Sequence, residues 1–62
     1  DGIDANYFYA DCLRDQNDWA GARTAFQKAL AAPARPGREV ADAGRRQEAQ
    51  AKLKDVTAHL AH

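Results

Sequence analysis

The chain has 62 residues, with nine basic and nine acidic side chains and therefore no net charge at neutral pH. Balanced charge argues against a surface built to bind nucleic acid or an anionic membrane, and the length allows one small unit near the lower limit for folding alone. About a quarter of the residues are alanine, which favours helix but adds little apolar area. We therefore expect a marginal monomer that is stabilised by self-association or by the rest of a longer protein. The sequence starts with Asp1-Gly2-Ile3 and contains no methionine, so we also expect it to be an excised or proteolysed piece of a larger protein.

A first helix is predicted over residues 4–15. Asp4 is suited to be its N-cap, because a carboxylate can accept hydrogen bonds from the free amides of a first turn. Apolar residues then recur at spacings of three and four, which is the period of a helix with one packed face. The residues expected on or beside that face are Tyr9, Leu13, Ala5, Ala10 and Cys12.

A second helix is predicted over residues 19–32. Asn17 and Asp18 interrupt the pattern, and Asp18 is suited to cap the next helix, with Trp19 as its first apolar anchor. Its inward stripe is expected to be Ala22, Phe26, Ala29 and Leu30. Because the connection is short, the two helices must be antiparallel neighbours.

Residues 33–37 form the clearest break, since Pro33 ends a helix and Pro36 disfavours helical geometry before it. A third helical segment is predicted over residues 38–60. Gly44 leaves two alternatives, one long helix or a helix broken at the glycine, and we favour the long one because Asp42 and Arg46 would bridge it. The apolar positions of this segment are Val40, Ala49, Leu53, Val56 and Leu60, and its expected ion pairs are Arg38/Asp42, Asp42/Arg46 and Glu48/Lys52.

The order of bulky and small residues over about residues 5–33 resembles the tetratricopeptide repeat. The positions that carry the resemblance are Tyr9, Ala10 and Leu13, the turn Asn17-Asp18-Trp19, then Ala22, Phe26, Ala29, Leu30 and Pro33. Asn6 departs from the family, which has an aromatic residue there. The resemblance implies an antiparallel helical hairpin whose small residues let the two backbones approach.

After Pro33 the resemblance decays. Ala49 has the spacing of the second helix of another repeat and would be equivalent to Ala22, but the two are 27 residues apart, where a full repeat would give about 34. We therefore expect a terminal helix that covers the open apolar side of the hairpin, as repeat arrays require. The predicted fold is all-α, with a hairpin over residues 1–33, a Pro/Gly linker over 34–37 and a capping helix with its tail over 38–62.

The resemblance also implies a protein–protein interaction module, the terminal part of a longer repeat scaffold, with a protein or peptide partner. First helices line the concave side of such arrays, so the residues expected to contact a partner are Asn6, Tyr7, Asp11 and Arg14. The competing interpretation is that Tyr7 and Phe8 complete the core or touch a second copy. A second hypothesis is a structural module that self-associates through Leu53, Val56 and Leu60.

Other chemistries find little support in the sequence. No nucleotide-binding loop, nucleophile elbow, catalytic carboxylate pair or zinc-ligand set is present, so we expect neither an enzyme nor a cofactor. His59 and His62 are three apart, but two histidines in a tail are a weak metal site. Cys12 is expected to pack and not to react, and as the single cysteine it leaves the compartment open.

Four arginines raise the question of an anion-binding patch. They are Arg35, Arg38, Arg45 and Arg46. Because Glu39, Asp42 and Glu48 are interleaved with them, we expect local neutralisation and no nucleic-acid site. No apolar run approaches the ~20 residues that span a membrane.

Overall fold

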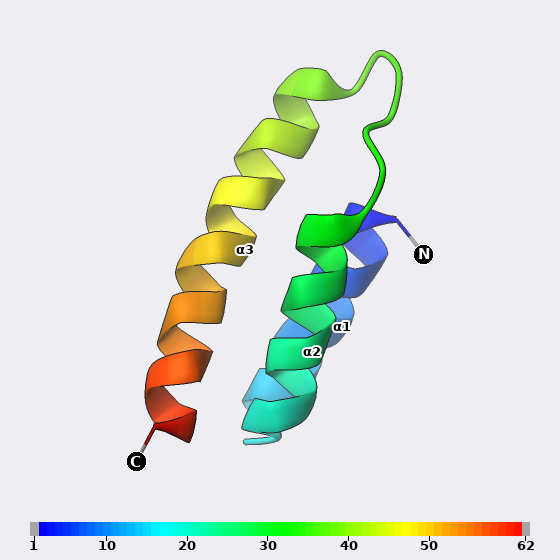
Figure 1. Ribbon diagram of the computed structural model, residues 1–62. Helices are drawn as coiled ribbons and strands as arrows, with labels where there is room; N and C mark the ends of the chain where they lie inside the picture. Colours follow the sequence, from blue (N-terminus) through cyan, green and yellow to red (C-terminus); the bar gives the residue numbers. More distant parts are fainter. Residues whose placement is uncertain (1, 62) are drawn as a thin grey trace.

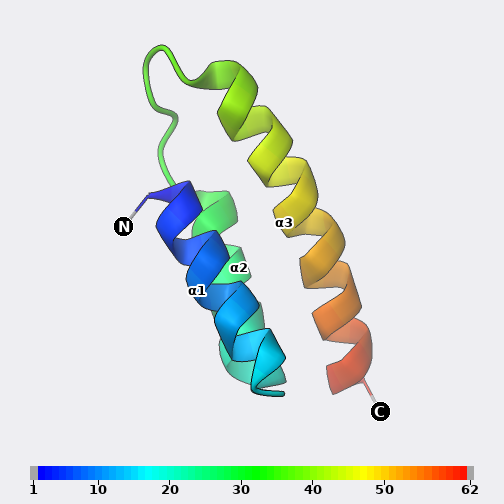
Figure 2. The ribbon, with the colours of Figure 1, turned by 180° about the vertical axis from the view of Figure 1, so that it is seen from behind.

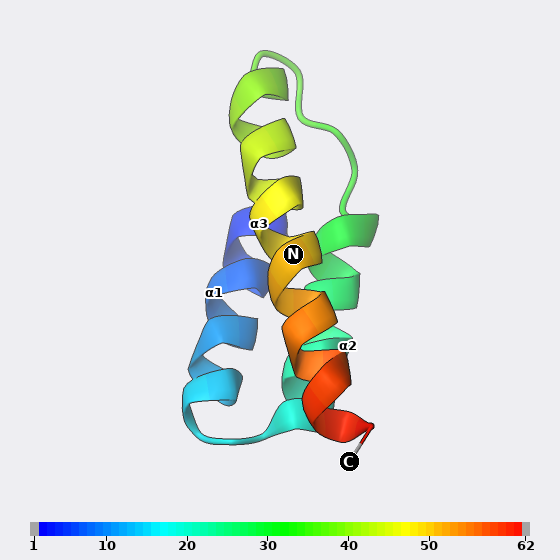
Figure 3. The ribbon, with the colours of Figure 1, turned by 90° about the vertical axis from the view of Figure 1, so that its left-hand side faces the viewer.

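The computed structural model describes residues 2–61, and it contains three α-helices in this range and no strand. They are α1 (Ile3–Asp15), α2 (Trp19–Ala31) and α3 (Glu39–Leu60). Helices α1 and α2 form an antiparallel hairpin, and α3 runs back along it in the same direction as α1 (Figure 1, Figure 2). Seen from the side of α3, this helix lies over the line between α1 and α2 (Figure 3). The all-α hairpin with a third, longer helix is confirmed.

The first helix begins differently from the prediction. Gly2 is the N-cap of α1 and no side chain caps it, so Asp4 lies inside the first turn. The prediction that Asp4 caps this helix is therefore wrong. Its carboxylate accepts hydrogen bonds from the side chains of Arg45 and Arg35 and not from the amides of the first turn. An acidic residue in the first turn still interacts favourably with the positive end of the helix dipole.

The turn between α1 and α2 follows the local sequence signals. Asn17 has a positive φ of 62°, a left-handed conformation that asparagine tolerates better than most residues. Asp18 caps α2 as predicted, its carboxylate accepting from the Gly21 amide at 3.1 Å. At the other end Ala32 is extended, as expected for the residue before Pro33, and α2 stops one residue earlier than predicted.

The linker makes a tight turn before α3. The Arg38 amide donates to the Arg35 carbonyl at 3.1 Å, with Pro36 and Gly37 between them. Gly37 has φ +77°, which a proline-then-glycine turn of type II requires and which other residues adopt with strain. The helix then runs unbroken through Gly44, so the long-helix alternative is confirmed. Its first turns extend beyond the end of the hairpin (Figure 1), and this leaves Val40 89% exposed, contrary to the expected apolar face.

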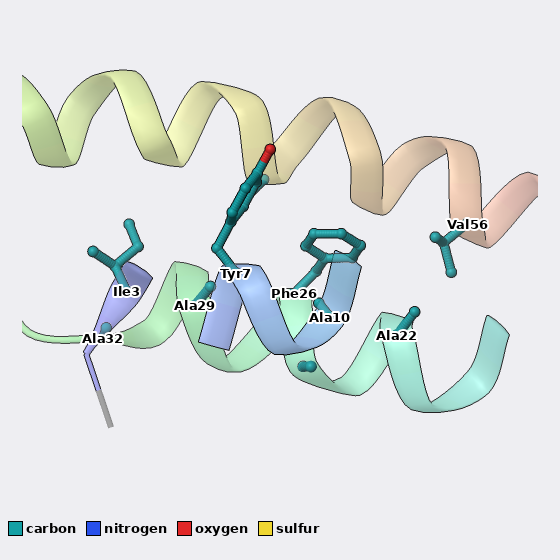
Figure 4. Packing of buried hydrophobic residues seen from close by; sticks show 10 residues of the cluster. Ile3, Tyr7, Ala10, Ala22, Phe26, Ala29, Ala32 and Val56 are labelled. Carbon is teal, nitrogen blue, oxygen red and sulfur yellow. The ribbon is translucent and has the colours of Figure 1, made fainter. Parts of the chain in front are cut away.

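The core lies between the hairpin and α3 (Figure 4). Ala10, Ala22 and Phe26 are completely buried, which confirms the predicted packing of small residues around an aromatic ring. The tyrosines correct the prediction, because Tyr7 is 3% exposed and Tyr9 is 61% exposed. The full buried apolar set is Ile3, Tyr7, Ala10, Ala22, Ala25, Phe26, Ala29, Ala32, Ala49 and Val56, with Leu13, Trp19, Leu30 and Leu53 half-buried around it.

Candidate interaction surfaces

A ladder of polar contacts joins α1 to α3. Each rung links a residue of α1 to the residue 41 positions later in the chain, as parallel helices in a fixed register allow. The rungs are Asp4–Arg45 (3.0 Å), Tyr7–Glu48 (3.4 Å), Asp11–Lys52 (2.9 Å) and Arg14–Asp55 (3.7 Å). The ion-pair side chains remain partly exposed, so the ladder orients α3 more than it stabilises the fold.

Three of the four residues predicted to contact a partner belong to this ladder. Tyr7 is buried, and Asp11 and Arg14 are paired both with α3 and with each other. The burial of Tyr7 agrees with the competing interpretation that this residue completes the core. Asn6 lies on another flank of α1, where its side-chain amide donates to the Gly2 carbonyl at 3.1 Å. The four residues therefore do not form one surface.

The cations of the ladder also contact aromatic rings. The Arg45 guanidinium lies 4.7 Å from the centre of the Tyr7 ring and 4.9 Å from that of Phe8. The Lys52 ammonium lies 4.8 Å from the Tyr7 ring. Burial lowers the pKa of Lys52, but its interactions with Tyr7 and Asp11 outweigh burial, so the pKa is raised overall and the ammonium stays charged.

A second polar cluster ties the linker to α3. The buried carboxylate of Asp42 accepts from the Arg35 backbone amide at 3.3 Å and from its guanidinium, with Nε at 3.1 Å. The hydrogen bond from the Arg35 side chain lowers the pKa of Asp42 although burial acts in the opposite direction. Arg46 donates to the carbonyls of Leu30 and Ala32, at 2.7 Å to the latter, and so satisfies the end of α2.

The predicted local neutralisation of the arginines is confirmed for Arg35 and Arg45, although much of it comes from Asp4 on another helix. Arg46 is occupied by backbone carbonyls. None of the expected pairs Arg38/Asp42, Asp42/Arg46 and Glu48/Lys52 forms an ion pair within residues 2–61. Three of the four arginines are thus occupied within the protein, and Arg38 is exposed without an ion pair among the described residues.

The opposite flank of the hairpin carries an open groove of about 320 Å³. No residue of α3 lines it. Its lining residues are Asn6, Tyr9 and Leu13 from α1, the cap Asp18, and Gly21, Thr24, Ala25 and Lys28 from α2. We call this the hairpin groove. The sequence interpretation missed it because it placed Tyr9 in the core, yet the spacings of three and four on both helices were a signal for a shared stripe.

The outer side of α1, beside this groove, exposes an aromatic side chain and a cysteine. Phe8 is 56% exposed, and Cys12 is exposed too, which corrects its expected packing role. Of the charged residues in α1, only Asp15 has no ion pair within the described residues. Exposed aromatic side chains are enriched at protein interfaces.

The sequence offered His59 and His62 as a weak candidate metal site. His62 lies outside the described residues. His59 stacks on Trp19, with ring centres 4.0 Å apart and an interplanar angle of 4°, and so fastens the end of α3 to the start of α2. Within residues 2–61, no group of three or more potential ligands lies close enough to hold a metal ion.

Comparison with protein-family models, curated proteins and solved structures gives no match for this chain. Among the described residues, no helix is both long enough and apolar enough to cross a membrane.

Proposed function

We propose that this chain is a protein–protein interaction module, the terminal part of a tetratricopeptide-type repeat scaffold, and that it catalyses no reaction. The observation that carries the proposal is the difference between the two flanks of the hairpin. One flank is covered by α3, which buries Ala49 and Val56 against it. The other flank holds the hairpin groove and the exposed Tyr9, so it is available to a neighbour.

Repeat arrays explain such an asymmetry. Each hairpin buries its apolar sides against the units before and after it, and the last hairpin needs a cap with a polar outer face. The outward positions of α3 suit this role, because Gln47, Gln50 and Lys54 are exposed. The offset of 41 between α1 and α3 exceeds the repeat period of about 34 by seven residues, or about two helical turns. A third helix displaced in this way fits a cap better than a next repeat.

The test is to supply the missing neighbour. A consensus tetratricopeptide unit fused before residue 1 should cover the hairpin groove, raise the urea midpoint of this chain and merge the two unfolding transitions into one. Tyr9→Lys should remove that coupling, while Gln50→Lys on the outer face of α3 should not. Two independent transitions, with the midpoint of this chain unchanged, would refute the proposal.

The alternative of self-association through α3 meets an obstacle. Val56 is completely buried against the hairpin and Leu53 is half-buried, so neither is free to pack on a second copy while this fold persists. Only Leu60 of that set is exposed. Light scattering across a concentration range would reveal a dimer if this alternative were correct.

A further inference from the structure

The junction between the linker and α3 is exposed on both sides of the Arg38–Glu39 peptide bond. All residues from 36 to 41 are exposed, and they stand beyond the end of the hairpin that lies opposite its turn (Figure 1, Figure 2). The Arg38 side chain forms no ion pair within residues 2–61. A protease can therefore reach both this side chain and the bond that follows it, and exposed loop tips are where folded proteins are preferentially cut.

Three hydrogen bonds hold this junction in place. The Arg38 amide donates to the Arg35 carbonyl at 3.1 Å, the Asp42 amide donates to the Arg38 carbonyl at 2.8 Å, and the Gly37 amide donates to the Glu39 carboxylate at 3.3 Å. A protease binds its substrate in an extended conformation, so the first turn of α3 must unwind before cleavage. That turn buries no side chain before Asp42, so its unwinding is local and costs little free energy.

The other basic residues are protected. Arg35 is followed by Pro36, before which trypsin-like proteases do not cut, and its guanidinium is held by Asp42. The remaining ones lie inside helices, where cleavage requires packed turns to unwind: Arg14, Arg23, Lys28, Arg45, Arg46, Lys52 and Lys54. Arg14 is close to the exposed turn between α1 and α2, but its guanidinium is paired with two carboxylates.

Cutting the bond would leave α3 without a covalent connection to the hairpin. Three residues of α3 are buried, Asp42, Ala49 and Val56, and the ladder that joins this helix to α1 is partly exposed. The linker now gives α3 an effective concentration on the order of millimolar, which cleavage removes. The new ammonium group at Glu39 would also lie at the positive end of the α3 dipole, where a cation is unfavourable. We therefore expect α3 to leave the hairpin at micromolar concentrations.

We propose that the Arg38–Glu39 bond is a cleavage site for a trypsin-like protease and that its hydrolysis uncaps the hairpin. Water is the co-reactant: the amide C–N bond breaks, the hydroxyl group joins the carbonyl carbon of Arg38, and the hydrogen goes to the nitrogen of Glu39. At neutral pH the products are a carboxylate and an ammonium group. This inference rests on the proposed role of α3 as a cap and adds a way in which the cap is removed.

Limited digestion of the folded chain with trypsin, followed over time by mass spectrometry, tests the site. The first products should be residues 1–38 and 39–62. Arg38→Gln should slow the loss of intact chain by about tenfold or more, because every other cut needs a larger opening, and it should leave the urea midpoint nearly unchanged. Arg23→Gln removes another exposed arginine without an ion pair in residues 2–61 and should change neither quantity. A first cut elsewhere, or an unchanged rate in Arg38→Gln, would overturn the inference.

The same digestion tests the release of α3. Both fragments should be degraded faster than the intact chain is cut, because neither fragment keeps the packed core. When an inhibitor stops the digestion after the first cut, residues 39–62 should elute separately from residues 1–38 in gel filtration at micromolar concentration. A cut protein that accumulates and elutes as one species would contradict the uncapping. If the fused repeat unit stabilises a chain that trypsin does not cut at Arg38, the inference fails and the proposed function stands.

Discussion

Replacing Tyr7 with alanine should nearly unfold this protein, whereas the same change at Tyr9 should cost little. Truncating a buried aromatic residue costs about 3–5 kcal/mol, and exposed substitutions usually stay within about 0.5 kcal/mol. At about 0.05–0.15 kcal/mol per residue, a chain of 62 residues has a free energy of unfolding of about 3–9 kcal/mol. Tyr7→Ala therefore removes a large share of the total, and Tyr9→Ala does not.

The contacts of Tyr7 place the cost of its truncation in the range of about 3–5 kcal/mol that buried aromatic residues show. Its ring lies edge-on to Phe26, with centres 5.9 Å apart, and its hydroxyl is directed at α3 (Figure 4). Alanine would remove this contact and the cation–π contacts of Arg45 and Lys52 together. The hydroxyl itself matters less, because its hydrogen bond to Glu48 is long at 3.4 Å. Tyr7→Phe should therefore cost no more than about 1 kcal/mol.

Urea denaturation followed by circular dichroism at 222 nm measures these differences, with Tyr9→Ala as the matched control. The two tyrosines are two residues apart on the same helix, so helix propensity changes equally in both variants. A larger loss at Tyr9 than at Tyr7, or equal losses, would show that α1 is rotated from the orientation described and that Tyr9 faces the core.

Four further variants test the caps and the linker cluster. Because the hydrogen bond from Arg35 lowers the pKa of Asp42, the stabilisation that this ionised carboxylate provides should be complete well above the ordinary carboxyl pKa of 3.8. It should be lost below that value, as the pH falls through the lowered pKa of the folded state. As the pH falls below about 4, the urea midpoint of the native chain should then fall more steeply than that of Asp42→Asn. Asp18→Ala should cost about 1 kcal/mol in urea unfolding, and Asp18→Asn much less. Arg46→Ala leaves two carbonyls at the end of α2 without their donor, which should cost about 1–3 kcal/mol and speed amide exchange in that turn.

The features that the sequence predicted best are those that act over a few residues. The cap at Asp18 and the stop before Pro33 depend only on neighbouring backbone groups; the cap is found where expected, and α2 ends within one residue of the prediction. The hairpin follows from them, since a short connection leaves two helices no other arrangement. The small buried residues Ala10 and Ala22 then follow from helical spacing.

Which aromatic residue faces the core was not predictable in the same way. Tyr7, Phe8 and Tyr9 are consecutive, so together they cover about 200° of the helix surface and periodicity does not choose among them. The choice depends on where α3 lies, because the ring of Tyr7 reaches Lys52 and Glu48 on that helix. The hairpin groove was missed for the same reason.

The charge pairs show the same limit. Pairs four residues apart were predicted within α3, but Lys52 pairs with Asp11 on α1 instead of with Glu48. Arg45, for which no pair was predicted, joins Asp4 on α1 as well as Glu48 on its own helix. The signal was present in the sequence, since Asp4 and Asp11 are seven apart, as are Arg45 and Lys52. Two helices with charges at the same spacing can form a ladder, but the spacing alone does not give its register.

The register comes from burial. A shift of α3 by seven residues, about two turns, would turn nearly the same face to the hairpin and still join opposite charges, Asp11 to Arg45 and Arg14 to Glu48. That arrangement would have the offset of about 34 that a regular repeat carries. The shift would also put Asp42 at the buried position that Ala49 now occupies, away from Arg35. It would move Val56 out of the buried position that it now occupies against the hairpin. A carboxylate without its partner in the core is costly, and so is the exposure of a buried valine. The buried Asp42 therefore selects one of two electrostatically acceptable registers, as a single buried polar residue does in a coiled coil.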